Sequence, residues 1–365
     1  MTSVTIPDSV TGIGKGAFSS CRGLTVVEIS DLASWCEISF EYYDSNPLYY
    51  SEHLFLNGNK IKDLILPDSV TKIGERAFSH CRDLTSVKIP NSVTEIGNNA
   101  FSYCSGLTSV KIPDSVTKIG EGAFSCCSGL TSVIIPNSVT RIYSSTFEYC
   151  DNLTSVTIPN SIKKIDSSAF EGCNSLTSIT IPSSVKKIDS GAFDGCKSMT
   201  SVTWNAKNCS DFESDEDTPF KDLLGINTFR FGKDVQKIPA NLCNGLIGLK
   251  TITIGREVKK IHVPAPLCEL YRGLKYYPFL RENSVTLIGD YAFKDCKALL
   301  TVTNNALTPQ PINETVFSGV DVCQIALLVP EDSYDLYNHV AHWKDFLVKI
   351  NGVEGAEVDK DKKEI

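Results

Sequence analysis

Residues 107–127 read LTSVKIPDSVTKIGEGAFSCC, and this stretch decides the fold because its pattern recurs along most of the chain. Six consecutive copies can be aligned on a proline, and each copy is separated from the next by 23 residues. The aligned residues are Pro67, Pro90, Pro113, Pro136, Pro159 and Pro182. A period in this range predicts a solenoid, in which each repeat forms one coil and stacks on its neighbours.

The first half of the unit predicts a short strand. Val110 and Ile112 alternate with Ser109 and Lys111, which is typical of a strand with one buried and one exposed face. Pro113 cannot donate a hydrogen bond to a sheet, so we expect the strand to end there. Stacking of the coils should then place these strands side by side as a parallel sheet on one face of the solenoid.

The second half of the unit is expected to cross to the other side. Val116 and Ile119 should return to the core, and Gly120 should supply a backbone conformation with positive φ. The stretch from Ala123 to Cys127 should form a short helical or 3-10 turn opposite the sheet, with a phenylalanine filling the coil.

We expect one solenoid over residues 1–352, with irregular insertions near residues 33–60, 205–226 and 262–283. The first residues begin partway through a coil, so we expect the array to continue upstream. The first insertion ends near Asn57-Gly58, a pair typical of a hairpin turn. Leu327–Pro330 should be the last strand, and a helix from Ser333 to about Phe346 should complete a cap near residues 327–352. Residues 353–365 are expected to be a flexible tail.

The unit L-T-S-V-x-I-P-x-S-V-T-x-I-G-x-x-A-F-x-x-C resembles the BspA-like leucine-rich repeats of bacterial surface proteins. Leu107, Val110 and Ile112 reproduce the leucine-rich spacing L-x-x-L-x-L. The resemblance covers nearly the whole chain and implies a leucine-rich-repeat solenoid of the α/β repeat type. It also implies a secreted or surface-attached protein that adheres to host or microbial partners.

The cysteines that share one slot of the repeat are expected to be reduced and buried. Equivalent side chains in successive coils point the same way, so their Cβ atoms should not converge as a disulfide requires. An unpaired cysteine packs as a small apolar side chain. The chain has 14 cysteines, and eight share one repeat slot: Cys21, Cys81, Cys104, Cys127, Cys150, Cys173, Cys196 and Cys296. The remaining six show no readable pairing: Cys36, Cys126, Cys209, Cys243, Cys268 and Cys323.

The sequence shows no signature of catalysis, so we expect neither an enzyme nor a cofactor. The five histidines do not fall at matching slots of neighbouring coils, and a serine or cysteine nucleophile needs a base within hydrogen-bond reach. No cysteine and histidine set has the spacing of a zinc site. The acidic run Asp211–Asp217 lacks the glycine and the final glutamate of a calcium-binding loop. A solvated loop is the better interpretation, and cation binding there stays open.

The composition limits the kinds of partner. A net charge of −8 argues against nucleic acid, which requires a basic surface. No apolar run approaches the roughly 20 residues that span a bilayer, so we expect no membrane insertion. An extracellular protein or polysaccharide is the expected partner, and the chain is expected to be a monomer.

Two groups of residues are candidates for binding. The outward strand positions form columns rich in serine and threonine, and one column varies most at Lys88, Lys111 and Ile134 before continuing with Thr157 and Thr180. The first insertion carries clustered tyrosines, which suit an interface but could also only cover the coils that they interrupt. They are Tyr42, Tyr43, Tyr49 and Tyr50.

These observations favour a non-catalytic binding module of a secreted or cell-surface protein that adheres through the solenoid face. The alternative is a structural spacer that displays another domain of a longer chain.

Overall fold

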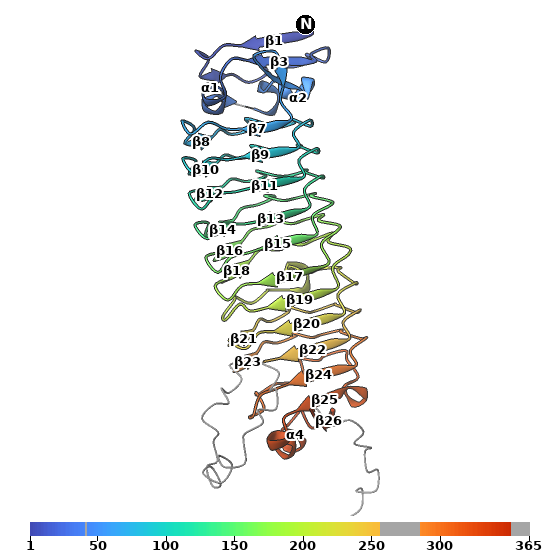
Figure 1. Cartoon of the computed structure of the whole chain (residues 1–365). Helices are drawn as coiled ribbons and strands as arrows, with labels where there is room; N and C mark the ends of the chain where they lie inside the picture. Colours follow the sequence, from blue (N-terminus) through green and yellow to red (C-terminus); the bar gives the residue numbers. More distant parts are fainter. Residues whose placement is uncertain (41, 256–284, 352–365) are drawn as a thin grey trace, which may run out of the picture.

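Each repeat begins with a strand whose apolar residues point inward and whose polar residues point to solvent, and the strands stack along the whole molecule (Figure 1). The computed structural model describes residues 1–40, 42–255 and 285–351. The long strands are β1 (Ser3–Ile6), β3 (Val26–Ile29), β5 (Leu54–Leu56), β7 (Asp63–Ile65), β9 (Ser86–Lys88), β11 (Ser109–Lys111), β13 (Ser132–Ile134), β15 (Ser155–Thr157), β17 (Ser178–Ile181), β19 (Ser201–Trp204), β20 (Thr228–Phe231), β22 (Thr251–Ile254), β24 (Thr301–Asn304), β25 (Ala326–Val329) and β26 (Leu347–Ile350).

The long strands pair in parallel with equivalent repeat positions in register, as Ser86, Val87 and Lys88 pair with Ser109, Val110 and Lys111. They form three successive sheets: β1-β3-β5 with β6 (Asn59–Lys60) at its edge, β7 to β15, and β17 to β26. The predicted parallel-strand solenoid with a 23-residue period is therefore confirmed, with about 14 coils.

A second column of short strands runs beside the first, and the sequence analysis did not predict it. Its members pair in parallel and mostly consist of a basic residue followed by isoleucine. They are β2 (Gly12–Ile13), β4 (Ser39–Phe40), β8 (Lys72–Ile73), β10 (Glu95–Ile96), β12 (Lys118–Ile119), β14 (Arg141–Ile142), β16 (Lys164–Ile165), β18 (Lys187–Ile188), β21 (Lys237–Ile238) and β23 (Leu287–Ile288).

Between the short strand and the next long strand, each coil makes a zigzag of turns. Backbone bonds of the 3-10 type link Ala123 N to Gly120 O and Cys127 N to Phe124 O, at 3.3 and 3.2 Å. Equivalent turns stack along one edge of the solenoid (Figure 1). The described α-helices lie in the first insertion and the cap: α1 (Leu32–Glu37), α2 (Leu48–Ser51) and α4 (Tyr334–His339). Short 3-10 helices occupy Tyr43–Ser45, Asp215–Asp217, Val322–Gln324 and Glu331–Ser333.

The prediction of positive φ at Gly120 is wrong. Positive φ occurs two residues later, at Gly122 and at Asn99 and Ser145 in the neighbouring coils. Glycine is needed at Gly120 because the coils approach closely there: a Cβ atom would lie 2.6 Å from the backbone nitrogen of Asn98.

Stacked phenylalanine rings fill the core. Successive ring centroids lie 5.4 to 5.6 Å apart and the ring planes differ by 4 to 19°. The stack comprises Phe78, Phe101, Phe124, Phe147, Phe170, Phe193 and Phe220. Phe220 belongs to the irregular stretch near residues 205–226, which therefore still contributes to the common core.

The cysteine column lies beside these rings, and its thiols are free as predicted. Cys21 is half-buried and the other seven members are buried. The sulfur does more than fill space, because Cys127 Sγ donates to Phe101 O in the preceding coil at 3.1 Å. The same bond recurs from Cys104, Cys150, Cys173 and Cys196 at 3.1 to 3.3 Å. Burial raises the pKa of Cys127 well above its ordinary value, so the thiol keeps its proton.

The C-terminal cap differs in detail from the prediction. Strand β25 is followed by a further strand, β26, which pairs with it in parallel, and helix α4 ends at His339. The cap buries Trp343, whose indole nitrogen donates to Gln310 O at 2.7 Å. The insertion expected near residues 262–283, Cys268 and the expected tail at 353–365 lie outside the described residues.

Candidate functional site

The variable outward column of the long strands lies in one line across the sheet. Ile65 pairs in register with Lys88, Lys88 with Lys111, and Ile134 with Thr157. Strand spacing places neighbouring members of this column about 4.8 Å apart. The column therefore presents an apolar residue, two lysines and a second apolar residue over four successive coils.

Two adjoining hollows of about 520 and 730 Å³ follow this part of the column, at the C-terminal ends of β7 to β13. Ile65, Lys88 and Lys111 line the first, and Lys111 and Ile134 line the second. Ile65 and Ile134 are 62% and 68% exposed. We call this feature, from Ile65 to Ile134, the strand-face groove.

The strand-face groove carries charges of both signs. Lys88 and Lys111 are exposed, and the structure gives neither an ion pair among the described residues. Asp68 lines the first hollow and Asp114 the second. Two adjacent cations with apolar neighbours favour a ligand that supplies an anionic group together with apolar surface.

The basic residues of the short strands instead form ion pairs with neighbouring acidic residues. Glu95 lies between Lys72 and Lys118, with ion-pair distances of 3.2 and 2.8 Å. The hydrogen bond from Lys118 holds the pKa of Glu95 below its ordinary value. Asp166 joins Arg141 to Lys164 at 2.6 and 3.1 Å. The lysine pair of the strand-face groove therefore differs from the basic residues of the short strands.

The threonines that continue the column lie outside the strand-face groove. Thr157 and Thr180 are exposed, as predicted for outward strand positions, but they line neither hollow. The sequence analysis named Lys88, Lys111 and Ile134 but missed Ile65. Ile65 nevertheless occupies the same repeat slot, because it precedes Pro67 by two residues just as Lys88 precedes Pro90.

The tyrosines of the first insertion lie in contact with one another. Ring centroids are 4.7 Å apart for Tyr42 and Tyr43, 5.1 Å for Tyr43 and Tyr49, and 4.9 Å for Tyr49 and Tyr50. Tyr42 and Tyr43 are exposed. The hydroxyl of Tyr50 accepts a hydrogen bond from Ser20 N at 2.9 Å. The cluster therefore both covers the underlying coils and presents rings to solvent.

The aromatic contacts continue beyond the insertion, which the sequence analysis missed. Tyr49 contacts the ring of His80 at 4.9 Å, and His80 stacks on Tyr103 at 4.5 Å with planes 4° apart. Tyr149 occupies the same repeat slot two coils further on. In the sequence, the only indication of these contacts was that the residue type in this slot varies, since later coils carry Gly172 and Gly195.

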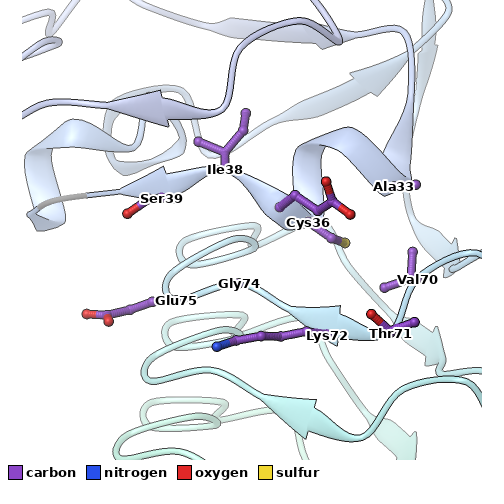
Figure 2. Close-up of a pocket in the computed structure, with 10 residues that line it drawn as sticks. Ala33, Cys36, Ile38, Ser39, Val70, Thr71, Lys72, Gly74 and Glu75 are labelled. Carbon is purple, nitrogen blue, oxygen red and sulfur yellow. The ribbon is translucent and has the colours of Figure 1, made fainter.

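A third hollow of about 370 Å³ lies where the first insertion meets the regular coils (Figure 2). Cys36, Lys72, Gly74 and Glu75 line it. Burial raises the pKa of the Cys36 thiol to about 12, and the lining residues include no histidine to act as its base. The hollow therefore lacks the activated nucleophile that acyl-transfer chemistry would need.

Two carboxylates of the acidic run are paired with lysines. Asp211 pairs with Lys237 at 2.5 Å and accepts a hydrogen bond from Ala240 N at 2.8 Å. Glu216 pairs with Lys221. Within residues 1–40, 42–255 and 285–351, no group of three or more histidine, cysteine, aspartate or glutamate side chains could hold a metal ion. In the same part of the chain, no helix is long and apolar enough to cross a bilayer.

Comparison with known proteins agrees with this architecture. A leucine-rich repeat protein from Bacteroides ovatus shares 20% identity, with 95% of this chain and 91% of that chain covered and a TM-score of 0.55. A leucine rich cell surface protein from Faecalibacterium prausnitzii shares 22% identity over 93% and 90% of the two chains, with a TM-score of 0.40. The first likeness shows the fold. No curated protein matches the sequence.

The family signature described as BspA type Leucine rich repeat region matches residues 1–46, 48–174, 140–265 and 275–338, in six copies. These ranges include both irregular stretches of the described chain as well as the regular coils. The chain belongs to the BspA-type leucine-rich repeat family.

Proposed function

We propose that the chain is a non-catalytic binding module of a secreted or cell-surface protein, and that it adheres to an extracellular protein or polysaccharide through the strand-face groove. One observation carries the proposal: two exposed isoleucines bracket two lysines that have no ion-pair partner among the described residues, on a sheet face otherwise lined mainly by hydroxyl side chains.

The rigidity of the sheet supports binding at this place. Strand pairing fixes the backbone of Ile65, Lys88 and Lys111 in register, so a ligand meets a surface that is already ordered. Binding then requires little conformational ordering of the protein, and this reduces a major cost of association. The family supports the proposal too, because its members are bacterial surface proteins and leucine-rich repeat proteins typically bind other proteins.

The proposal can be tested with a triple variant, Lys88→Glu, Lys111→Glu and Ile134→Glu. The wild type and the variant would be screened for adhesion to immobilised extracellular-matrix proteins and glycans. Carboxylates at these positions would repel an anionic ligand and remove the apolar contact, so we expect the variant to lose the adhesion of the wild type. Adhesion by the wild type should also weaken as salt is raised.

The control places three glutamates in the same column outside the strand-face groove: Thr203→Glu, Thr253→Glu and Thr303→Glu. These residues pair through the intervening strands of the last sheet. The control variant should adhere like the wild type. Equal loss in both variants would assign the effect to net charge, and unchanged adhesion in the groove variant would move the site elsewhere. If the wild type bound no immobilised partner, a structural spacer would be the better explanation.

A further inference from the structure

A line of aromatic rings follows the turn edge of the solenoid, away from the strand-face groove. We call it the tyrosine ridge and define it as Tyr42, Tyr43, Tyr49, His80, Tyr103 and Tyr149. Ring contacts at 4.5 to 5.1 Å connect all of them from Tyr42 to Tyr103. Tyr103 and Tyr149 are 46% and 45% exposed. In the chain, the ridge residues of each regular coil precede a long strand, whereas the groove residues come at its end.

The backbone holds the regular part of the tyrosine ridge in a fixed orientation. His80, Tyr103 and Tyr149 have φ values of 66, 61 and 53°, in the left-handed region that is uncommon for bulky residues. In the next coil this slot is Gly172, and a Cβ atom there would lie 2.4 Å from Cδ1 of the Tyr149 ring. The ring of Tyr149 therefore rests directly on the backbone of the following coil.

Carboxylates lie beside these rings. The Tyr149 hydroxyl donates to Glu171 Oε1 at 3.1 Å, and Glu148 Oε2 accepts from Ser125 Oγ at 3.3 Å. The four turn segments around Tyr103 and Tyr149 are residues 98–106, 121–129, 144–152 and 167–175, whereas the equivalent segment of His80, residues 75–83, carries Arg76 and Arg82. The four segments around the two tyrosines contain four acidic residues and neither lysine nor arginine. The edge around Tyr103 and Tyr149 is therefore both aromatic and anionic.

We propose that the part of the tyrosine ridge around Tyr103 and Tyr149 binds an arginine-bearing segment of a partner protein. A guanidinium group can stack on a tyrosine ring while its N–H groups bond to an adjacent carboxylate, and a planar guanidinium does both better than an ammonium. The molecule already makes such contacts internally: Arg141 lies 4.6 Å from the centroid of the Tyr143 ring, and Lys15 lies 4.9 Å from that of Tyr42. The inference does not depend on the strand-face groove, because the two surfaces share no residue.

A neutral sugar is the other ligand that exposed tyrosines suggest. It would use ring faces and hydroxyl contacts, and it would not need uncompensated negative charge. The acidic residues of the four turn segments, with no basic residue among them, instead match a cation. The observations therefore favour arginine, and binding of a neutral glycan is an outcome that the test must distinguish.

The test measures the affinities of fluorescent nona-arginine and nona-lysine peptides by anisotropy at physiological salt. Both peptides carry the same charge, so a purely electrostatic surface would bind them equally. We expect the wild type to prefer nona-arginine at least about fivefold, because two exposed rings can each take part in a stacking contact. Replacing Tyr103 and Tyr149 by glycine should abolish that preference. Glycine occurs in this slot at Gly172 and Gly195, so the backbone conformation is retained.

Two further variants separate the contribution of negative charge from that of ring stacking and from that of the strand-face groove. The double variant Glu148→Gln with Glu171→Gln removes negative charge but no ring. It should therefore weaken the binding of both peptides and keep the preference for nona-arginine. Lys88→Glu with Lys111→Glu changes the strand-face groove and should leave the arginine preference intact. Equal affinity of the wild type for the two peptides would refute the proposal. So would an arginine preference that survives loss of both rings in a folded variant, or ring-dependent binding of neutral glycans without binding of either peptide.

Discussion

The phenylalanine stack predicts how the stability of the solenoid is distributed among its coils. Phe147 lies in the middle of the stack, fully buried, with Phe124 at 5.6 Å on one side and Phe170 at 5.5 Å on the other. The proposed perturbation is Phe147→Ala, with Phe147→Leu as the companion variant that keeps most of the apolar volume. Each coil contacts mainly its neighbours, so the damage should remain local.

The magnitude follows from burial and ring contacts. Truncation of a fully buried phenylalanine to alanine costs about 3 to 5 kcal/mol in the free energy of unfolding. The leucine variant loses two stacked ring pairs, each worth about 0.5 to 1.5 kcal/mol, so we expect a loss of about 1 to 3 kcal/mol. Both variants should retain the overall fold at 25 °C, because only the contacts of one coil with its neighbours are weakened.

The assay is native-state hydrogen exchange, read coil by coil. The amides of Phe124, Phe147 and Phe170 donate to the next coil at 2.8 to 2.9 Å in the wild type. We expect these amides to exchange faster in Phe147→Ala, while those of β1 and β3 at one end and β25 and β26 at the other keep their protection. A uniform loss of protection along the chain would refute nearest-neighbour stabilisation and indicate that the array unfolds as one unit.

Three further predictions concern single side chains. Cys127→Ser should lower the free energy of unfolding by about 1 to 3 kcal/mol, because a hydroxyl replaces a thiol in an apolar site. Urea denaturation should show that Cys126→Ser, in contrast, is nearly as stable as the wild type. Burial lowers the pKa of His80 to about 4, so the unfolded chain takes up the proton first and stability should fall as pH drops from about 6.5 toward 4. His80→Asn should remove that part of the pH slope in thermal melts. Trp343→Phe leaves Gln310 O without its indole donor, and calorimetry should show a loss of about 1 to 3 kcal/mol.

The inward face of the coil was the easiest part to predict from the sequence. Val110 and Ile112 alternate with polar residues, and both are buried in the solenoid. The short strands gave no comparable signal, because a two-residue element such as Lys118–Ile119 is too short to show alternation. The positive-φ slot was also hidden, since residues such as Asn99 and Ser145 occupy it instead of glycine alone.

The two candidate surfaces differ in how far the sequence could reveal them. The strand-face groove was partly predicted, because Lys88, Lys111 and Ile134 interrupt a column of threonines in regular repeats. The tyrosine ridge was not, because it joins rings of an insertion to His80 and Tyr103, and insertions have no repeat register. Only the folded structure places Tyr49 against His80.

The identical register of neighbouring coils has a consequence for how this array can change its length. The central coils present chemically similar partners on both sides, as in the successive pairs Ser86 with Ser109 and Ser132 with Ser155. Excision of residues 151–173 would remove one 23-residue period and join Cys150 to Asn174, so that Phe147 meets Phe193 in place of Phe170. Gains and losses of whole periods in this region can therefore yield folded chains, while the four coils that carry Ile65 to Ile134 must persist intact for the strand-face groove to survive.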